Sequence, residues 1–504
     1  MLTAPKLDYA LLAPILIILA GALIGVLVEA LVGRAVRASI QLSIALGSIV
    51  LAFAQIWRIR HDASISAAVG SVTIDGFGIF IQGVILVMAF ISVLYIADTD
   101  NFTAQASSIP GSNEERVAIQ EGKQQTEIFP LTLFSVAGML LFPVASDLIT
   151  FFVALEMLSL PLYLMVGLSR RRRLLSQEAA LKYFLLGAFS SAFFLFGAAF
   201  LYGYSGYISL DGIASAIQTS SGNDVFLLIG IVFLSVGLLF KIGAVPFHSW
   251  TPDVYQGAPT PITAFMAACT KIAAVGATLR IFYVGFAGAE WQWKPIILVI
   301  AILTMFVGGI AAIAQRDVKR MLAFSSIAHA GFLLTAVLAL NASGLRGALF
   351  YLATYGFTTL GAFGVITLVR DSSGEVTDLN RWIGLGKKSP LAAGVFALFL
   401  LSFAGIPLTS GFVAKFALFT GAYESGNTTV VVAGVLVSAI TAFFYLRVIV
   451  MLFFTDAKSD SVSVVIPSAM TRIAIAVCAI VTVVLGIAPS LLLNAVEPFS
   501  YFLR

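Results

Sequence analysis

The chain has 504 residues, of which 60% are hydrophobic and only 11% are charged. Charged residues make up about 25% of an ordinary soluble domain, so this composition excludes a soluble globular protein. The net charge of +4 does not indicate a nucleic-acid partner, because most basic residues fall in loops between apolar segments, where they orient helices.

Apolar runs of about twenty residues, the length that crosses a bilayer as a helix, recur from end to end. A transmembrane β-barrel would instead show segments of about ten residues with alternating polarity. The pattern predicts an all-α polytopic membrane protein with about fourteen transmembrane helices. In chain order we expect them at 9–32, 38–58, 77–97, 129–145, 148–168, 178–203, 225–248, 260–282, 294–314, 320–341, 346–370, 391–422, 429–455 and 467–495.

These helices fall into groups along the chain. Three lie in 1–97, two blocks of five lie in 129–282 and 294–455, and the last helix and the tail lie in 467–504. The polar stretch 98–128 is predicted to be a cytoplasmic loop that could contact a neighbouring subunit. Because five is an odd number, the second block starts on the opposite side of the membrane from the first, as an inverted repeat requires.

Basic residues gather in the loops opposite the termini, for example in the run Arg170–Arg173 and at Lys387 and Lys388. Cytoplasmic loops carry an excess of Lys and Arg. We therefore expect both termini to lie outside the cytoplasm of a bacterial cell membrane. The arginine run is interpreted as a topology anchor, with a lipid-headgroup or partner site as the alternative.

Two predicted helices are interrupted near mid-membrane. Gly243 and Pro246 interrupt the seventh, and Gly405 and Pro407 interrupt the twelfth. Proline lacks a backbone donor and clashes with the preceding turn, and freed backbone groups are tolerated at membrane depth only where protein or a polar cavity satisfies them. Each interrupted helix is the fourth of its block, so the breaks favour an inverted repeat and predict an internal hydrated path.

Ionisable residues recur inside these hydrophobic segments, where a charge is costly unless it is paired or hydrated. Such residues indicate movement of ions or protons, and they are Glu156, Lys182, Lys241, His248, Lys271, His329 and Lys415. A desolvated lysine suits proton transfer, because its protonation responds to burial and to a nearby carboxylate. Glu156 is the candidate carboxylate for Lys241, and its movement toward Lys182 would release a proton from Lys241.

Some of these residues also have plainer explanations. Lys182 lies near a helix end and could extend its ammonium group to the membrane surface. A lone histidine is usually structural, and His248 could relay a proton or merely cap a backbone group. His329 follows Ser325 and Ser326 on one helical face, which favours a place in a relay.

Only two cysteines are present, Cys269 and Cys478, and both lie in apolar segments. Neither has a CxxC partner or a nearby cluster of histidine and cysteine. The pattern offers no ligand set for iron–sulfur clusters, zinc or haem, so we expect no cofactor, no metal and no redox centre in this chain.

Four segments resemble the antiporter-like membrane subunits of respiratory complex I. They are Leu155–Leu160, Lys241–Pro261, Gln315–His329 and Ala404–Phe416. Within the second, the stretch TPDVYQGAP from Thr251 to Pro259 is most similar to the N-type subunits of NADH–quinone oxidoreductase. The resemblance extends over 129–455, and the three preceding helices fit the fourteen-helix bacterial form.

The resemblance implies roles for the ionisable residues. Glu156 and Lys241 match the family's ion pair beside the pump site, and Lys182 matches the modulating lysine of the sixth helix. Lys271 matches the central bridging lysine, with His329 on the polar axis between the two halves.

In the second half, Lys415 matches the broken-helix lysine that is linked to the outer side. A lysine at this position argues against the M-type paralogue, and the lack of a long lateral helix after Leu493 argues against the L-type. The residues Gly243, Pro246, Gly405 and Pro407 match the family's helix breaks.

The resemblance implies proton translocation from the cytoplasm to the outside, driven by quinone reduction elsewhere in NADH–quinone oxidoreductase. The implied partners are the neighbouring antiporter-like subunit M, the small subunits J and K, the lateral helix of subunit L, and lipids. Flavin and iron–sulfur clusters are expected in partner subunits of this respiratory enzyme, with no nucleic acid involved.

Two other functions share this fold. A subunit of a monovalent cation/proton antiporter would need oxygens that coordinate Na⁺, whereas the buried series is mostly cationic. A subunit of a membrane-bound hydrogenase would use the same pumping residues with a different soluble arm. A purely structural membrane scaffold leaves so many buried charges unexplained.

Overall fold

The structure, a computed structural model, describes residues 7–60, 65–98, 113, 117, 125–168, 173–220, 223–371, 374–456 and 462–502. Within these residues twelve helices are long and apolar enough to cross a membrane, so the chain is a multi-pass membrane protein. Twelve of the expected spans coincide with these helices, and the other two, 129–145 and 391–422, hold shorter apolar helices. Most of the predicted loop 98–128, and residues 170–172 of the arginine run, lie outside the described residues.

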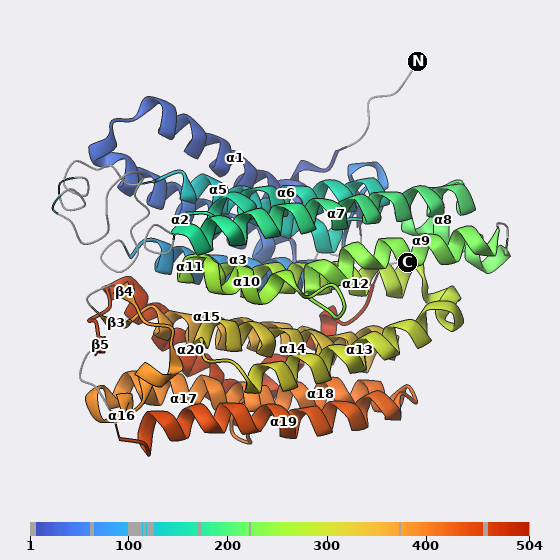
Figure 1. Cartoon of the computed structure of the whole chain (residues 1–504). Coiled ribbons are helices and arrows are strands. Elements are labelled where there is room, and N and C mark those ends of the chain that lie inside the picture. Colours follow the sequence, from blue (N-terminus) through green and yellow to red (C-terminus); the bar gives the residue numbers. More distant parts are fainter. Residues whose placement is uncertain are drawn as a thin grey trace.

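The helices of the N-terminal half run side by side in the upper part of Figure 1. The long ones are α1 (Tyr9–Leu31), α2 (Arg34–Ile59), α3 (Gly76–Ile96), α5 (Ile128–Leu141), α6 (Leu148–Val166), α7 (Arg173–Ser205) and α9 (Asp224–Ile242). The short ones are α8 (Leu210–Thr219), α10 (Trp250–Gly257), α11 (Thr260–Phe265) and α12 (Lys271–Arg280). The amphipathic connector α8 was not expected from the apolar runs.

The helices of the C-terminal half occupy the lower part of Figure 1. They are α13 (Glu290–Ile313), α14 (Val318–Ala339), α15 (Ala342–Ile366), α16 (Leu385–Lys388), α17 (Pro390–Ala404), α18 (Ser410–Glu424), α19 (Thr428–Phe453), α20 (Ala469–Ile487) and α21 (Ser490–Val496). Strands are confined to connections. The antiparallel pair β1 (Ile65–Ala67) and β2 (Val72–Ile74) precedes α3, and β3 (Val369–Asp371) lies between β4 (Gly374–Glu375) and β5 (Ser463–Val464).

Aspartate side chains fix the starts of three long helices. Asp75, Asp147 and Asp317 accept hydrogen bonds from first-turn amides of α3, α6 and α14. A helix start leaves these donors without intrahelical partners, and an aspartate at the N-cap position accepts from one of them. The acidic residues at the borders of apolar runs therefore act as helix caps.

The buried centre of the bundle consists of α14, α15 and the segment Thr260–Gly285, which are enclosed almost completely by the rest of the chain. Helices that are apolar all round belong inside a protein or a membrane. Glycine allows α13 and α14 to approach closely, because an added Cβ at Gly308 would lie 2.4 Å from the backbone nitrogen of Ala328. This is the small-residue packing expected between membrane helices.

An enclosed ion pair joins the N-terminal helices to the central segment. Arg280, at the end of α12, donates to both carboxylate oxygens of Asp75 at 2.7 and 2.9 Å, and the two side chains are 2% and 0% exposed. Its Nε donates to the carbonyl of Pro143 at 2.6 Å, and its guanidinium lies over the Phe502 ring at 5.2 Å. Four distant parts of the chain thus meet at one guanidinium.

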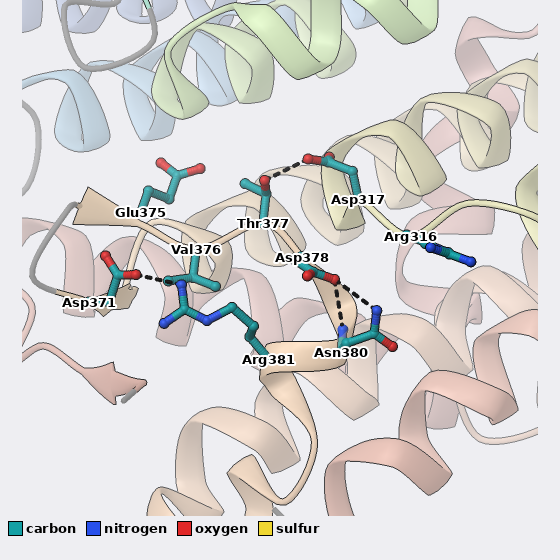
Figure 2. Close-up of a pocket in the computed structure, with 9 residues that line it drawn as sticks. All are labelled: Arg316, Asp317, Asp371, Glu375, Val376, Thr377, Asp378, Asn380 and Arg381. Atoms are coloured by element: carbon teal, nitrogen blue, oxygen red, sulfur yellow. Dashed lines mark hydrogen bonds and ion pairs between the residues drawn. The ribbon is translucent and has the colours of Figure 1, made fainter. Parts of the chain in front are cut away.

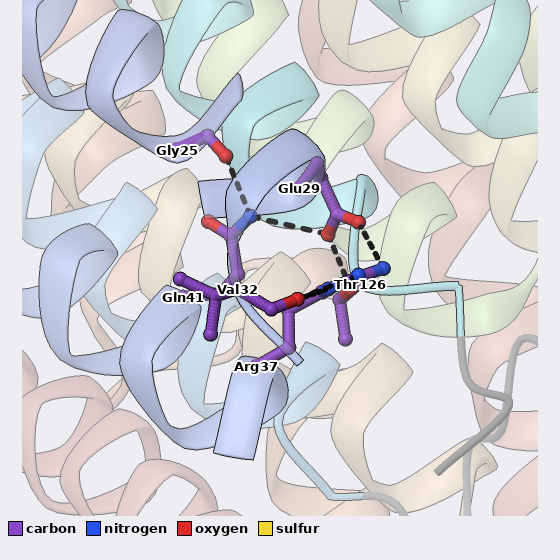
Figure 3. A network of polar contacts seen from close by, with 6 residues as sticks. All are labelled: Gly25, Glu29, Val32, Arg37, Gln41 and Thr126. Carbon is purple, nitrogen blue, oxygen red and sulfur yellow. Dashed lines mark hydrogen bonds and ion pairs between the residues drawn. The ribbon is translucent and has the colours of Figure 1, made fainter. Parts of the chain in front are cut away.

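A second polar network closes the turn between α1 and α2 (Figure 3). Glu29 accepts from Arg37 at 2.9 Å and from Gln41 at 3.1 Å, and Thr126 also donates to it. Gln41 donates further to the carbonyl of Gly25 at 2.8 Å. Glu29 is therefore neutralised by a neighbouring arginine, and the network ties α1 and α2 to the residues just before α5.

Candidate functional site

The first helix break lies between α9 and α10. Helix α9 ends at Ile242, and Gly243 follows with φ of 81°, a left-handed conformation that glycine adopts without a steric penalty. The groups freed by the break have protein partners: Trp250 donates to the Phe240 carbonyl at 3.0 Å, and Val245 N donates to Thr304 at 3.0 Å. Hydrogen bonds from other parts of the chain therefore stabilise the break.

Lys241 is the last charged residue before this break. Its side chain is buried, with 4% of the residue exposed, and its Nζ donates to the Tyr183 hydroxyl at 3.3 Å. The ammonium also lies 5.8 Å from the Tyr163 ring centre and 5.2 Å from that of Tyr183. Two tyrosine rings and one hydroxyl thus surround a cation that has little water around it.

Glu156, on α6, is near enough to Lys241 for an electrostatic interaction, but among the described residues no ion pair within 4.0 Å joins them. One carboxylate oxygen, Oε1, is buried without a hydrogen-bond partner in the described part of the chain. A buried oxygen of this kind is costly unless water or another group reaches it. In this structure Glu156 and Lys241 therefore interact at a distance longer than 4.0 Å, without a direct ion pair.

Lys182 has partners that the sequence interpretation missed. Its Nζ bonds to Asp253 at 2.7 Å and to Glu178 at 2.6 Å, and its side chain is 41% exposed. Arg320 also bonds to Asp253, at 2.5 Å. In this structure carboxylates of α7 and α10 hold the Lys182 ammonium at a partly exposed position, and the movement of Glu156 toward Lys182 stays a prediction.

His248 lies in the loop of the first break and is half-buried. Its Nδ1 is enclosed and lacks a hydrogen-bond partner within the described residues, while its backbone carbonyl accepts from Thr251 N at 2.9 Å. The imidazole also has a hydrogen-bond interaction with the backbone of Pro246, so both the capping and the relay interpretations stay open for His248.

Lys271 lies at the centre of the molecule, where α12 follows the π-helical segment Met266–Thr270. Single π-turns are rare and frequently mark functional sites. The residue is 4% exposed, and its Nζ donates to both the hydroxyl and the carbonyl of Ser326 at 2.5 Å. Tyr355 donates to the same hydroxyl at 3.0 Å, and the Tyr255 hydroxyl lies 3.5 Å from it.

A second set of hydroxyls surrounds His329, one turn further along α14. The Tyr351 hydroxyl is 2.5 Å from its Nδ1, and the Tyr445 hydroxyl is 3.4 Å from its Nε2. Tyr445 also hydrogen-bonds to Ser325. The Tyr355 ring, whose hydroxyl donates to Ser326, lies 5.1 Å from the His329 ring, so the polar groups around Lys271 and around His329 adjoin in one buried band.

The second helix break repeats features of the first. Helix α17 ends at Ala404, and Gly405 follows with φ of 79°. Lys415, on α18, is 6% exposed and donates to the Ala404 carbonyl at 3.0 Å. A cation is favoured at a helix C-terminus, where free carbonyls carry partial negative charge. Its Nζ also lies 4.9 Å from the Phe332 ring centre, one turn after His329.

A polar pocket of about 360 Å³ lies at one end of the bundle (Figure 2). On its wall, Arg381 donates to Asp371 at 2.6 Å, and Glu375 accepts from Thr260 at 2.5 Å. Thr260 begins α11, which leads to Lys271, so this end of the central segment adjoins a polar surface. The described residues hold no group of three or more histidine, cysteine, aspartate or glutamate side chains that could bind a metal.

The arrangement suits proton transfer rather than the making or breaking of covalent bonds. Hydroxyl and imidazole groups both donate and accept hydrogen bonds. Lys271 and Lys415, on either side of His329, can each hold or release a proton. Sequence interpretation found the lysines and His329 but missed the tyrosines 183, 255, 351, 355 and 445 and the serine–lysine contact. Tyrosine within an apolar run carries no signal that separates a relay from a packed core.

Comparison with known proteins bears on this arrangement. The family described as "NADH:quinone oxidoreductase/Mrp antiporter, TM" matches residues 145–441. NADH-quinone oxidoreductase subunit N of Rhodococcus opacus is 56% identical over 526 residues, with 99% of this chain and 97% of that protein covered. Subunit N of Mycobacterium tuberculosis is 50% identical over 530 residues, with 100% of both covered.

Solved structures are similar over nearly the whole chain. A chain of respiratory complex I from Thermus thermophilus with bound aureothin has a TM-score of 0.78 and 31% identity, covering 95% of this chain and 98% of that chain. A chain of the Mrp complex from a Dietzia species has a TM-score of 0.81 at 21% identity, covering 98% and 97%, and shows the common fold alone. The chain therefore belongs to the NADH:quinone oxidoreductase/Mrp antiporter membrane family, as a subunit N of NADH–quinone oxidoreductase.

Proposed function

We propose that this subunit translocates protons across the membrane through the buried band of ionisable and hydroxyl groups, driven by quinone reduction elsewhere in the oxidoreductase. The observation that carries the proposal is the contact between Lys271 and Ser326, because Ser326 also accepts from Tyr355, whose ring lies beside His329. A buried charge in a membrane protein indicates an ion or proton path by default.

In this proposal protons arrive from the cytoplasm near Lys182 and Lys241 and leave toward the outside near Lys415. Glu156 controls Lys241 through charge, since an approaching carboxylate favours the ammonium form and a departing one favours proton release. The free Oε1 of Glu156 and the absence of a close ion pair among the described residues support a carboxylate that moves. His248 lies in the loop that follows Lys241, between α9 and α10, and relays protons there.

The proposed topology has fourteen spans, with both termini outside the cytoplasm. It also has two inverted repeats, 129–282 and 294–455, and each repeat contains one of the helix breaks. Support comes from the matching ends of α9 and α17, each followed by a left-handed glycine and a nearby proline, Pro246 or Pro407. A buried lysine adjoins each break, as a pseudo-symmetric pair of half-channels requires.

The proposed partners are other subunits of the oxidoreductase, namely subunit M, the small subunits J and K and the lateral helix of subunit L. The proposal places flavin and iron–sulfur clusters in partner subunits and no cofactor in this chain. Support comes from relatives that are named as subunits of NADH-quinone oxidoreductase. Electrons then never reach this chain, and coupling is electrostatic and conformational.

The test uses the whole complex reconstituted into vesicles, with Lys241→Ala or Glu156→Ala. We expect NADH-driven lumenal acidification to fall while the amount of assembled complex stays close to that of the wild type. Lys294→Ala is a matched control, because Lys294 forms only a partly exposed pair with Glu290 at 3.2 Å. Normal acidification by an assembled Lys241→Ala complex would contradict the relay.

A further inference from the structure

A narrow apolar groove opens between α2, α3 and α20, outside the proposed relay. Its volume is about 340 Å³, and every side chain that lines it is hydrophobic. Its rim faces outward, since Val50, Phe53, Ile473 and Val477 are 53%, 38%, 58% and 39% exposed. These helices cross the membrane, so the rim faces either lipid or another membrane protein.

The charge beside the groove decides between these two occupants. The groove is lined only by hydrocarbon side chains, so its lining suits an acyl chain and the apolar face of a helix alike. An anionic phospholipid differs from an apolar helix face because it carries a negative charge at the membrane surface, which attracts arginine and lysine. The groups at the end of the groove therefore favour one occupant over the other.

The length of the groove matches one half of a bilayer. On α3 it runs from Leu86 to Leu94, which is about 12 Å at 1.5 Å per residue. The hydrocarbon core is about 30 Å thick, so each leaflet contributes about 15 Å. On α2 the groove reaches from Ile49 to Phe53, just past the middle of that helix, and on α3 it lies in the last half. The groove therefore extends from the middle of the membrane toward the end of α3 and the start of α20.

A cation stands at the end of the groove where a headgroup would lie. Arg472 is in the first turn of α20, directly before Ile473 of the groove, and it is exposed. It has no ion pair and no side-chain hydrogen bond with any residue that the structure describes. The nearby carboxylate of Asp98 is buried and accepts from Thr471 at 2.6 Å, so it is engaged elsewhere.

We propose that this groove holds one acyl chain of an anionic phospholipid, whose phosphate binds Arg472. Burial of the chain alone adds little affinity, because lipid tails are as apolar as the groove and membrane association lacks a hydrophobic driving force. Selectivity therefore comes from packing in the groove and from the arginine. The site joins the N-terminal helices α2 and α3 to α20, so the lipid bridges the two ends of the chain.

The test uses the intact complex in membrane vesicles, with a phosphatidylglycerol that carries a photoactivatable group in its acyl chain. After illumination, cross-linked peptides are identified by mass spectrometry. We expect cross-links on residues 86–94 and 473–477. Val477→Phe fills the groove and should abolish them, whereas Ile480→Phe, at a 60% exposed position outside the groove, should leave them unchanged.

Arg472→Gln keeps the groove and tests the headgroup contact separately. One arginine near a membrane surface contributes about 1 kcal/mol toward an anionic lipid, so cross-linking should fall about fivefold. The same variant should not alter cross-linking by a matching phosphatidylcholine, which must already be weaker with the wild type. Labelling that survives Val477→Phe, equal labelling by both lipids, or a protein segment lying in the groove in a map of the complex would each overturn the proposal.

Discussion

The enclosed ion pair between Asp75 and Arg280 allows a quantitative test of how the N-terminal helices are joined to the segment that carries Lys271. The pair has two hydrogen bonds of 2.7 and 2.9 Å, and the exposed fractions of its side chains are 0% and 2%. Asp75→Asn keeps the volume and a helix-capping oxygen but removes the charge, so the guanidinium stays buried without its counter-ion. Removing one partner of a buried pair costs about 3–5 kcal/mol.

The measurement is the free energy of unfolding of the chain, from titration of detergent micelles with a denaturing detergent while helix content is followed. Arg280→Met should be similarly destabilising, because it leaves the Asp75 carboxylate buried. Asp75→Asn combined with Arg280→Met should cost less than the sum of the two single changes by about 0.5–3 kcal/mol, the coupling typical of residues in direct contact.

An exposed ion pair in the same chain is the control. Arg346 and Glu497 are 3.8 Å apart, and their side chains are 33% and 67% exposed. Water screens such a pair, so Glu497→Gln should cost no more than about 1 kcal/mol. If Asp75→Asn destabilised the chain no more than Glu497→Gln does, the reasoning from burial would be refuted.

Two further substitutions address the relay and the second break. Ser326→Ala removes a hydrogen bond to the Lys271 ammonium, worth about 1.5–3 kcal/mol, so proton translocation per NADH in vesicles should fall in assembled complexes; an unchanged ratio would exclude the contact from the path. Gly411→Ala should lower the amount of assembled complex in membranes, because its Cβ would lie 1.8 Å from the Ser402 carbonyl oxygen. Gly394→Ala meets nothing within 4 Å and should leave assembly intact; equal loss in both variants would contradict the packing argument.

The spans could be predicted because a bilayer imposes a length and a composition on each helix. The ranges 9–32 and 38–58, for example, differ from α1 and α2 by only a few residues. The interruptions were visible because glycine and proline act locally. The loop strands β3, β4 and β5 were not, since pairs of two or three residues in polar connections leave no periodic signal.

The candidate site was predictable in part. Lys271 and His329 stood out because charge in an apolar run is unusual, and the two serines before His329 followed from helical spacing. The partner of Lys182 could not be inferred, because Asp253 is 71 residues away and reaches it only through the fold. The π-helical segment before Lys271 is set by tertiary packing, and nothing in Met266–Thr270 marks it in the sequence.

In the proposed mechanism, protons cross this subunit through Lys271. The most direct measurement is the number of protons translocated per NADH oxidised, with Lys271→Met in the intact complex reconstituted into sealed vesicles. We expect a lower ratio than in the wild type at an equal content of assembled complex, because methionine fills the volume but carries no proton. An assembled Lys271→Met complex with the wild-type ratio and the wild-type rate would contradict the proposed mechanism.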